Sequence, residues 1–226
     1  MMVLGPVLTD FWSAFAANHI TQLISSLRAL SHDTQPQAVA TLIQILSLLP
    51  DPKIEPYFRR FLRHPTQPQG IPTLIAAAFV RGVAWKRPSG PGQICSLLIY
   101  CLFWADTSLG DDGKASIDAS VRDTLAEKVG ILIESDEFTL LDRFQRVEVE
   151  RLKGILRTIE GMPEDAYLRS SRDHLEGQLE VCANMTCAEE AEMTCSRCKT
   201  VRYCGRAHQA HHWKNGHKLR CFSPTF

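Results

Sequence analysis

The strongest constraint on this sequence is a cluster of cysteine and histidine residues between positions 182 and 221. They occur as four pairs, with the spacings C-x4-C, C-x2-C, C-x3-H and H-x3-C, and are Cys182, Cys187, Cys195, Cys198, Cys204, His208, His217 and Cys221. Thiolates and imidazoles are the ligands that zinc prefers, and four of them complete a tetrahedral structural site. Eight ligands therefore predict two structural zinc ions.

The spacing within each pair indicates its local geometry. A C-x2-C pair forms a tight turn whose two sulfurs converge on one ion about 2.3 Å away. Ligands four residues apart lie on one face of a helical turn, so Cys204/His208 and His217/Cys221 predict two short helices. Spacing alone does not say how the four pairs combine into two sites. One possibility is sequential, with the first two pairs on one ion and the last two on the other.

The run CSRCKTVRYCGRAHQAHHWKNGHKLRC resembles the MYND-type zinc finger, including the Arg-Tyr-Cys that ends in the fifth ligand and the Gln and Trp after the sixth. Two departures are small: the first pair is C-x4-C, and His208 occupies a position where the family usually has cysteine. The resemblance implies a cross-braced arrangement rather than a sequential one. One ion would be held by Cys182, Cys187, Cys204 and His208, and the other by Cys195, Cys198, His217 and Cys221.

The same resemblance implies a function for the segment, because MYND fingers look like docking surfaces for short proline-containing peptides. The matching positions here are Ser196, Gln209 and Trp213, with Tyr203 close by. An exposed indole can stack on a proline ring, and a glutamine side chain can bond the peptide backbone. Trp213 has a second possible role, as the one large core residue packed between the zinc sites. Both roles stay open from the sequence.

Charge gives little support to a nucleic-acid partner. The chain has 25 Lys+Arg and 25 Asp+Glu, so its formal net charge is zero. Residues 182–221 carry a mild positive excess, which two Cys3His zinc sites would reduce further. Binding to a nucleic-acid backbone requires a denser basic surface. We therefore expect a protein partner.

The cysteines also bear on the compartment, because thiolates must stay reduced to hold metal. Apart from the cluster, the sequence has only Cys95 and Cys101, which we expect to be small core residues. The start, MMVLGPVLTDFW, lacks the basic region of a targeting segment. The longest apolar run, residues 94–105, is about half as long as a membrane span and predicts a buried helix. We expect an intracellular protein of the nucleus or cytoplasm, with no membrane segment.

Before the finger, apolar periodicity and proline or glycine breaks predict a mostly α-helical domain over residues 1–180, with the finger over 181–222. The arrangement is similar to that of many fungal MYND-domain proteins. The predicted helices span about 9–30, 36–49, 53–63, 72–87, 93–105, 116–133, 136–160 and 164–180. They would stack in pairs as in HEAT or armadillo repeats, or form an irregular bundle. In the helix over 53–63, Ile54 is expected inside and Arg59, Arg60 and Arg63 outside.

An enzymatic role is the alternative, because some MYND fingers are inserted in SET-domain lysine methyltransferases. Those catalytic domains are rich in strands, whereas this sequence predicts helices and lacks their cofactor motif. A zinc site with four protein ligands also has no open position for an activated water. We therefore expect a zinc-binding protein-interaction module with a helical scaffold, and not an enzyme.

Overall fold

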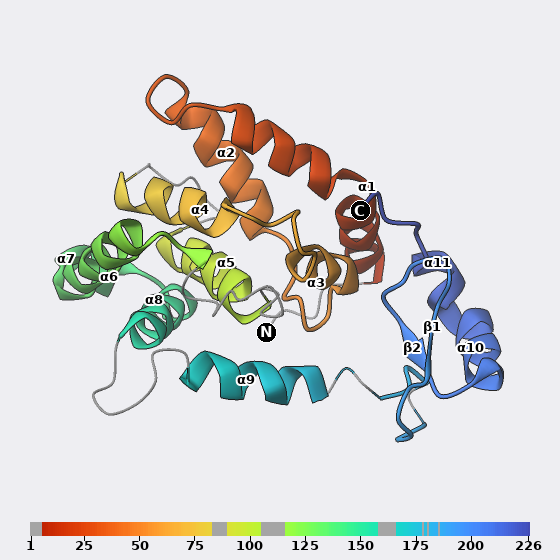
Figure 1. Cartoon of the computed structure of the whole chain (residues 1–226). Coiled ribbons are helices and arrows are strands. Elements are labelled where there is room, and N and C mark those ends of the chain that lie inside the picture. The colour runs from red at the N-terminus through yellow and green to blue at the C-terminus, as the bar shows by residue number, and fades with distance from the viewer. Residues whose placement is uncertain are drawn as a thin grey trace.

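The computed structural model describes residues 6–82, 90–104, 116–157, 166–177, 179, 181–184 and 186–226 of the 226-residue chain. A helical region is followed by a small finger, which confirms the predicted mostly α-helical class (Figure 1). The helices of this region are α1 (Pro6–Ala29), α2 (Pro36–Ser47), α3 (Pro56–Leu62), α4 (Ile71–Val80), α5 (Pro91–Trp104), α6 (Ala119–Glu134), α7 (Asp136–Leu140), α8 (Arg143–Leu156) and α9 (Ala166–Gly177).

Proline and acidic residues set where several of these helices begin. Pro36, Pro56 and Pro91 are the first residues of their helices, a position at which the missing N–H of proline costs nothing. Glu55 caps α3 by accepting a hydrogen bond from the N–H of Tyr57 at 3.0 Å. The helix predicted from residue 53 therefore begins only at residue 56.

The helix predicted over 136–160 is divided in the structure. Asp142 accepts a hydrogen bond from the N–H of Gln145 at 2.9 Å and so caps the start of α8. Leu141 and Asp142 both have extended backbone angles, which separates α7 from α8. The helix predicted over 72–87 ends at Val80, and Gly82 follows with φ 71°. Residues 83–87, 105, 158–160, 164–165, 178 and 180 of the predicted helices lie outside the described residues.

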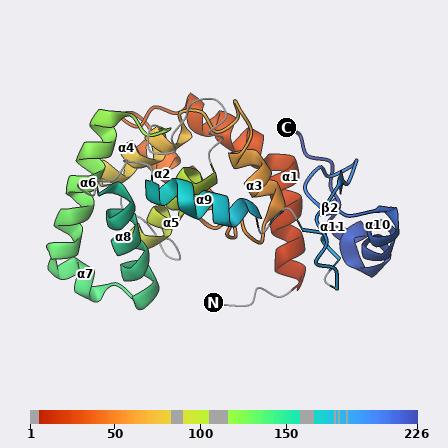
Figure 2. The same ribbon diagram turned by 60° about the horizontal axis from the view of Figure 1, so that its bottom comes forward.

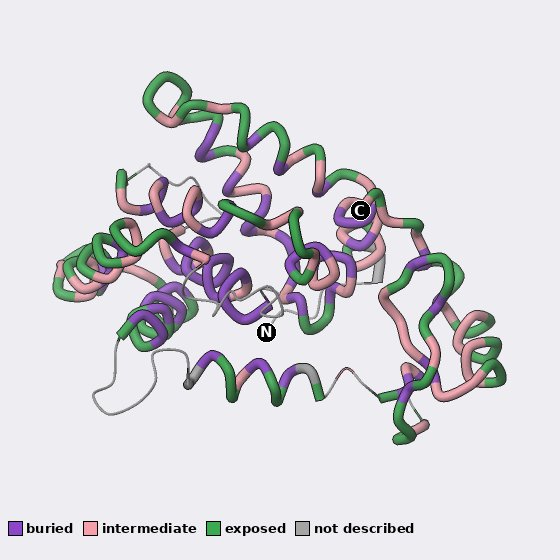
Figure 3. The backbone as a smooth tube through the Cα atoms, viewed as in Figure 1, coloured by how far each residue is buried: buried purple, intermediate pink, exposed green. Residues whose placement is uncertain are grey.

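Helix α5 is the centre of the core and packs against α2, α3, α4, α8 and α9. Its side chains are buried almost all round, as its uniform apolar sequence predicts, and they include Cys95 and Cys101. The buried Arg172 of α9 donates to the carbonyls of Leu102 and Phe103, at 2.8 and 3.1 Å. It thereby provides hydrogen-bond partners for carbonyl groups in the last turn of α5, which lack them within the helix. Figure 3 shows buried residues concentrated where α5 meets its neighbours.

Glycine allows α5 and α8 to approach closely. A β-carbon at Gly92 would overlap the backbone of Gln145 on α8.

One expectation about the core is wrong: Ile54 is 60% exposed, because it precedes the capped start of α3 rather than lying on its inner face. Among the described residues, no helix combines the length and the hydrophobicity needed to cross a bilayer.

The segment after the finger returns to the helical region and packs on α1 and α3 (Figures 1 and 2). The N–H of Thr225 donates to the carbonyl of Ala17 at 3.0 Å. The ring of Phe226 packs edge-on against Phe61, with 5.6 Å between the ring centroids. The finger is thus attached on both sides, by the chain that enters it at residue 181 and by residues 222–226.

Candidate metal centres

The finger begins with loops and a short hairpin and ends in two short helices. Strand β1 (Met193–Thr194) pairs antiparallel with β2 (Arg202–Tyr203), and Val181 forms an isolated bridge with Glu190. Helix α10 (Arg206–His212) is followed by a wide turn over Trp213–His217 and by α11 (Lys218–Arg220). Gly216 in this turn has φ 126°, a conformation that a side chain would strain. The turn changes the chain direction between the two predicted helical ligand pairs.

The eight predicted ligands form two groups of four, and within each group all ligand atoms lie within 4.8 Å of one another. The first group is Cys182, Cys187, Cys204 and His208, and the second is Cys195, Cys198, His217 and Cys221. The structure therefore brings the ligands together in the cross-braced order that the resemblance implies. The sequential order, which spacing left open, is not the one observed.

The distances between ligand atoms fit zinc with one exception, the 3.1 Å between Sγ of Cys204 and Nδ1 of His208, which is shorter than tetrahedral coordination gives. An ion about 2.3 Å from sulfur and 2.0–2.1 Å from nitrogen, in tetrahedral geometry, places its ligand atoms roughly 3.5–3.8 Å apart. The Sγ atoms of Cys187 and Cys204 are 3.7 Å apart, and Sγ of Cys182 lies 3.6 Å from Nδ1 of His208. In the second group, Sγ of Cys198 lies 3.7 Å from Nε2 of His217. Both groups are consistent with one zinc ion each.

The two sites differ in exposure, and the thiols of the second site show the balance of charge that favours a metal. All four ligands of the second site are buried, whereas three ligands of the first site are half-buried. Burial opposes ionisation of Cys195, but the N–H groups of Cys198 and Arg197 donate to its sulfur and hold the pKa of that thiol below its usual value. Burial and the neighbouring thiolates raise the pKa of Cys221. A divalent cation removes this repulsion, so the ligand set favours a bound metal.

A cluster of aromatic rings beside the second site was not predicted from the sequence. The buried Tyr203 has its hydroxyl 3.1 Å from Nδ1 of His212. The ring of His212 stacks on that of the ligand His217, with 5.2 Å between centroids. His212 therefore supports the site without belonging to either group. The C-x3-H spacing predicted His208 as a ligand, and His208 belongs to the first group, whereas His211 and His212 belong to neither.

The four predicted peptide-contact residues do not share one environment. Ser196 is exposed, and Gln209 and Trp213 are half-buried. The rings of Trp213 and His217 pack in a T-shaped arrangement, with 5.8 Å between centroids, so Trp213 packs beside the second site and also keeps part of its surface accessible. Tyr203 has no exposed surface. A peptide therefore cannot contact Tyr203 directly, because no part of this residue is accessible.

Comparison with known families agrees with this geometry, because residues 181–221 match the family model of the MYND finger. This segment is a MYND zinc finger. Such fingers are, in general, zinc modules that bind other proteins. The match covers the finger only. No solved structure matches the chain.

Several curated proteins share short stretches of similarity with this chain. Ubiquitin carboxyl-terminal hydrolase 19 of Arabidopsis thaliana is 44% identical over 50 residues, which is 22% of this chain and 7% of the relative. Hydrolase 17 of the same plant is 33% identical over 95 residues, 39% of this chain and 13% of the relative. Mouse programmed cell death protein 2 is 51% identical over 35 residues, 16% of this chain and 10% of the relative. The chain therefore matches only a small part of each relative.

Proposed function

We propose that the finger binds a short proline-containing peptide of a partner protein, and that the helical region is its scaffold. The observation that carries the proposal is the position of Gln209 and Trp213. They are four residues apart, and the backbone of Trp213 is still helical, with φ −57° and ψ −46°. Residues at this spacing lie on one face of a helix. An indole and an amide are therefore presented side by side.

The chemistry of this face suits an extended peptide. The indole of Trp213 packs against His217, so it needs little ordering to receive a proline ring. The amide of Gln209 has both a donor and an acceptor for the peptide backbone. The exposed Ser196 belongs to the C-x2-C turn of the second site and offers a hydroxyl group. Zinc would act on the peptide only indirectly, by fixing the turn and helices that carry these residues.

The proposed role is binding and not catalysis. Each ligand group already offers four protein atoms, so a zinc ion held there has no position for a reacting water. The relatives that are named hydrolases share only a small part of their length with this chain. Within the described residues, strands are confined to the finger hairpin, whereas a SET methyltransferase domain is rich in strands. Binding of S-adenosylmethionine by the purified chain would contradict this part of the proposal.

The contacts of residues 222–226 with α1 and α3 support the proposed scaffold role, because they hold the finger against the helical region. A HEAT- or armadillo-like stacking of helix pairs over residues 1–180 stays a prediction. The enclosure of α5 by several helices favours the irregular bundle. The reduced cysteines that the sites need favour a nuclear or cytoplasmic location.

The proposal is tested by the binding of fluorescein-labelled proline-rich peptides to the full zinc-loaded chain. We expect Trp213→Ala to weaken binding by about tenfold or more, because the variant loses the stacking surface. Leu219→Ala is the matched control, since Leu219 is an apolar finger residue that is 72% exposed. Native mass spectrometry would show that both variants retain two zinc ions.

Two results would overturn the proposal. One is equal binding of the proline-rich peptides by Trp213→Ala and by the unaltered chain. The other is equal binding of matched peptides in which alanine replaces every proline. The first result would show that Trp213 is only a core residue. The second would show that the finger does not recognise proline.

A further inference from the structure

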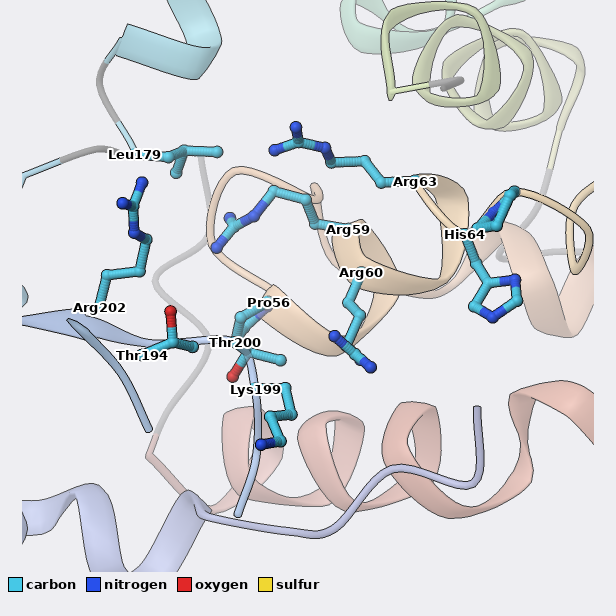
Figure 4. A pocket seen from close by; sticks show the side chains of 11 residues that line it. Pro56, Arg59, Arg60, Arg63, His64, Leu179, Thr194, Lys199, Thr200 and Arg202 are labelled. Carbon is cyan, nitrogen blue, oxygen red and sulfur yellow. The ribbon is translucent and has the colours of Figure 1, made fainter. Parts of the chain in front are cut away.

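Clefts separate parts of the finger from the helical region. One of about 450 Å³ lies between α3 and the hairpin of the finger, and Figure 4 shows Arg60 on its α3 side and Thr194 and Arg202 on its hairpin side. A second cleft of about 590 Å³ is lined by Ile54 of the helical region together with residues of the finger. Direct contacts between the two parts are made by the C-terminal end of the finger.

Residues 222–226 pack on α1 and α3, and this contact begins before them, within the finger itself. Nε of Arg220 donates to Oδ1 of Asp10 on α1 at 2.5 Å. Helix α11, which contains Arg220, also packs on α1. The contact with the helical region therefore runs through Cys221, the last ligand of the second zinc site.

Both peptide groups that flank Cys221 are held by one hydroxyl of the helical region. The hydroxyl of Tyr57 donates to the carbonyl of Arg220 and accepts from the N–H of Phe222, each at 2.7 Å. Cys221 is buried, and its Sγ lies 3.7 Å from Sγ of Cys195 in the same ligand group. The position of the Cys221 backbone thus depends on the helical region as well as on the other ligands of the second site.

The first site has no comparable support among the described residues. The residues next to its ligands form their hydrogen bonds within the finger, as between the N–H of Ala183 and the carbonyl of Arg202 at 2.9 Å. Ala183 also lines the larger of the two clefts, and three ligands of the first site are only half-buried. The helical region therefore contacts the surroundings of the second site and not those of the first.

We propose that Tyr57 is a positioning residue of the second zinc site, and that zinc in this site holds the finger against the helical region. Zinc fixes the backbone at Cys221, and this places the carbonyl of Arg220 and the N–H of Phe222 where Tyr57 bonds both. The coupling is reciprocal, because each of two linked equilibria strengthens the other by the same factor. Loss of the second ion would release residues 222–226, whereas loss of the first would not.

The ion is needed because the chain around Cys221 is weakly held by its own secondary structure. Helix α11 has three residues, whereas an isolated helix needs about 12 or more to be stable in water. The turn before it contains Gly216, and glycine has the greatest conformational freedom of all residues. Thiolates of Cys195, Cys198 and Cys221 would also repel one another without a cation between them. This link does not depend on which peptide the finger binds.

Two double variants of the full chain separate the sites. The first-site variant, Cys187→Ser with Cys204→Ser, keeps all four ligands of the second site. The second-site variant, Cys195→Ser with Cys198→Ser, keeps all four ligands of the first. Native mass spectrometry should find one zinc ion in each.

Hydrogen exchange of the amide groups of Phe222 and Thr225 then reports whether the C-terminal residues are docked. In the first-site variant both amides should exchange as slowly as in the unaltered chain. In the second-site variant they should exchange at least about tenfold faster, because their partners on Tyr57 and Ala17 are released. Slow exchange at Leu98, in the core helix α5, would show that the helical region is folded in both variants.

Tyr57→Phe tests the role of the hydroxyl. In the first-site variant it should weaken zinc binding by about tenfold, measured by competition with a chromophoric chelator, because the bound state leaves two backbone groups unpaired. In the second-site variant the same substitution should change zinc affinity by less than about twofold. Tyr100→Phe, which removes another hydroxyl of the helical region, is the matched control and should leave both affinities unchanged.

A measurement on the chain with all eight ligands decides the matter if either double variant holds no ion. An NMR-active cadmium isotope gives one signal for each site, and the signal of the second site is the one that couples to the β-protons of Cys221. Tyr57→Phe should shift this signal and leave the other in place. Equal exchange of Phe222 and Thr225 in the two double variants, equal loss of affinity at both sites, or cadmium signals that both move or both stay would overturn the proposal.

Discussion

The hydroxyl of Tyr57 on α3 accepts a hydrogen bond at 2.7 Å from the backbone N–H of Phe222, the residue that follows the last ligand of the second site. The same hydroxyl donates to the carbonyl of Arg220, also at 2.7 Å. One side chain of the helical region thus satisfies two backbone groups of the finger. Tyr57 is 1% exposed, so water cannot replace it in these contacts.

We predict that Tyr57→Phe lowers the free energy of unfolding by about 1–3 kcal/mol, because it leaves the N–H of Phe222 and the carbonyl of Arg220 without a partner. Urea denaturation followed by tryptophan fluorescence measures the change. Tyr100→Phe is the control, since the described residues provide no hydrogen-bond partner for the hydroxyl of Tyr100. Equal stability of the two variants would show that the Tyr57 hydroxyl does not join the two parts.

The cross-braced ligand groups predict different zinc contents for two double variants. Cys187→Ser with Cys204→Ser alters one site only and should leave one ion per chain. Cys187→Ser with Cys198→Ser alters both sites and should leave none tightly bound. Sequential sites would give the reverse result, so native mass spectrometry of the two variants distinguishes the arrangements.

The close approach of α5 and α8 makes Gly92 sensitive to substitution. We expect Gly92→Ala to reduce the free energy of unfolding by about 1–3 kcal/mol, because its β-carbon overlaps the backbone of Gln145. Gly154→Ala, within α8, is the matched control, since nothing lies within 4 Å of its added carbon. That variant should gain about 0.5–1 kcal/mol from helix propensity. A stabilising Gly92→Ala would contradict the observed packing.

Burial raises the pKa of Glu55 above its usual value of 4.5, although the hydroxyl of Ser13, the N–H of Tyr57, Arg59 and Arg220 oppose the shift. The native state therefore binds this proton more tightly than the unfolded chain does. The protonated Glu55 therefore stabilises the native state below pH 4.5, and this stabilisation is lost as the pH rises through the native pKa of Glu55.

Glu55→Gln keeps the shape of the side chain and one acceptor oxygen, replaces the other oxygen with an amide nitrogen, and removes the buried charge. We expect the variant to be more stable than the unaltered chain at pH 7, and the difference to shrink toward zero below pH 4.5. Thermal unfolding of the two proteins, compared at each pH, measures the difference. A variant that is less stable at pH 7 would show that the interactions of the carboxylate outweigh its burial.

Local sequence signals predicted the helices and the ligands well. Apolar periodicity located α1, α2, α5 and α6, because each buries one stripe or, in α5, nearly its whole surface. The division between α7 and α8 was missed although Asp142 and Gln145 carry a capping signal, because the apolar pattern continues across the break. The helix therefore breaks at the cap formed by Asp142, although the apolar periodicity continues across it.

Contacts between distant residues could not be predicted in this way. The position of residues 222–226 on α1 depends on hydrogen bonds such as that from Thr225 to Ala17, which no local pattern indicates. The basic face of α3 was predicted to be solvated, but Arg59 and Arg60 are half-buried because the finger packs nearby. The ligand pairing likewise came from resemblance, since spacing is compatible with either arrangement.

The order in which the chain supplies its ligands alternates between the two sites, pair by pair. A protease that cuts one peptide bond anywhere between Cys187 and His217 would therefore leave two fragments that still share a metal ion. With sequential sites, a single cut between Cys198 and Cys204 would release two separately metallated pieces. In this protein the nicked finger should migrate as one species until a chelator or a denaturant is added.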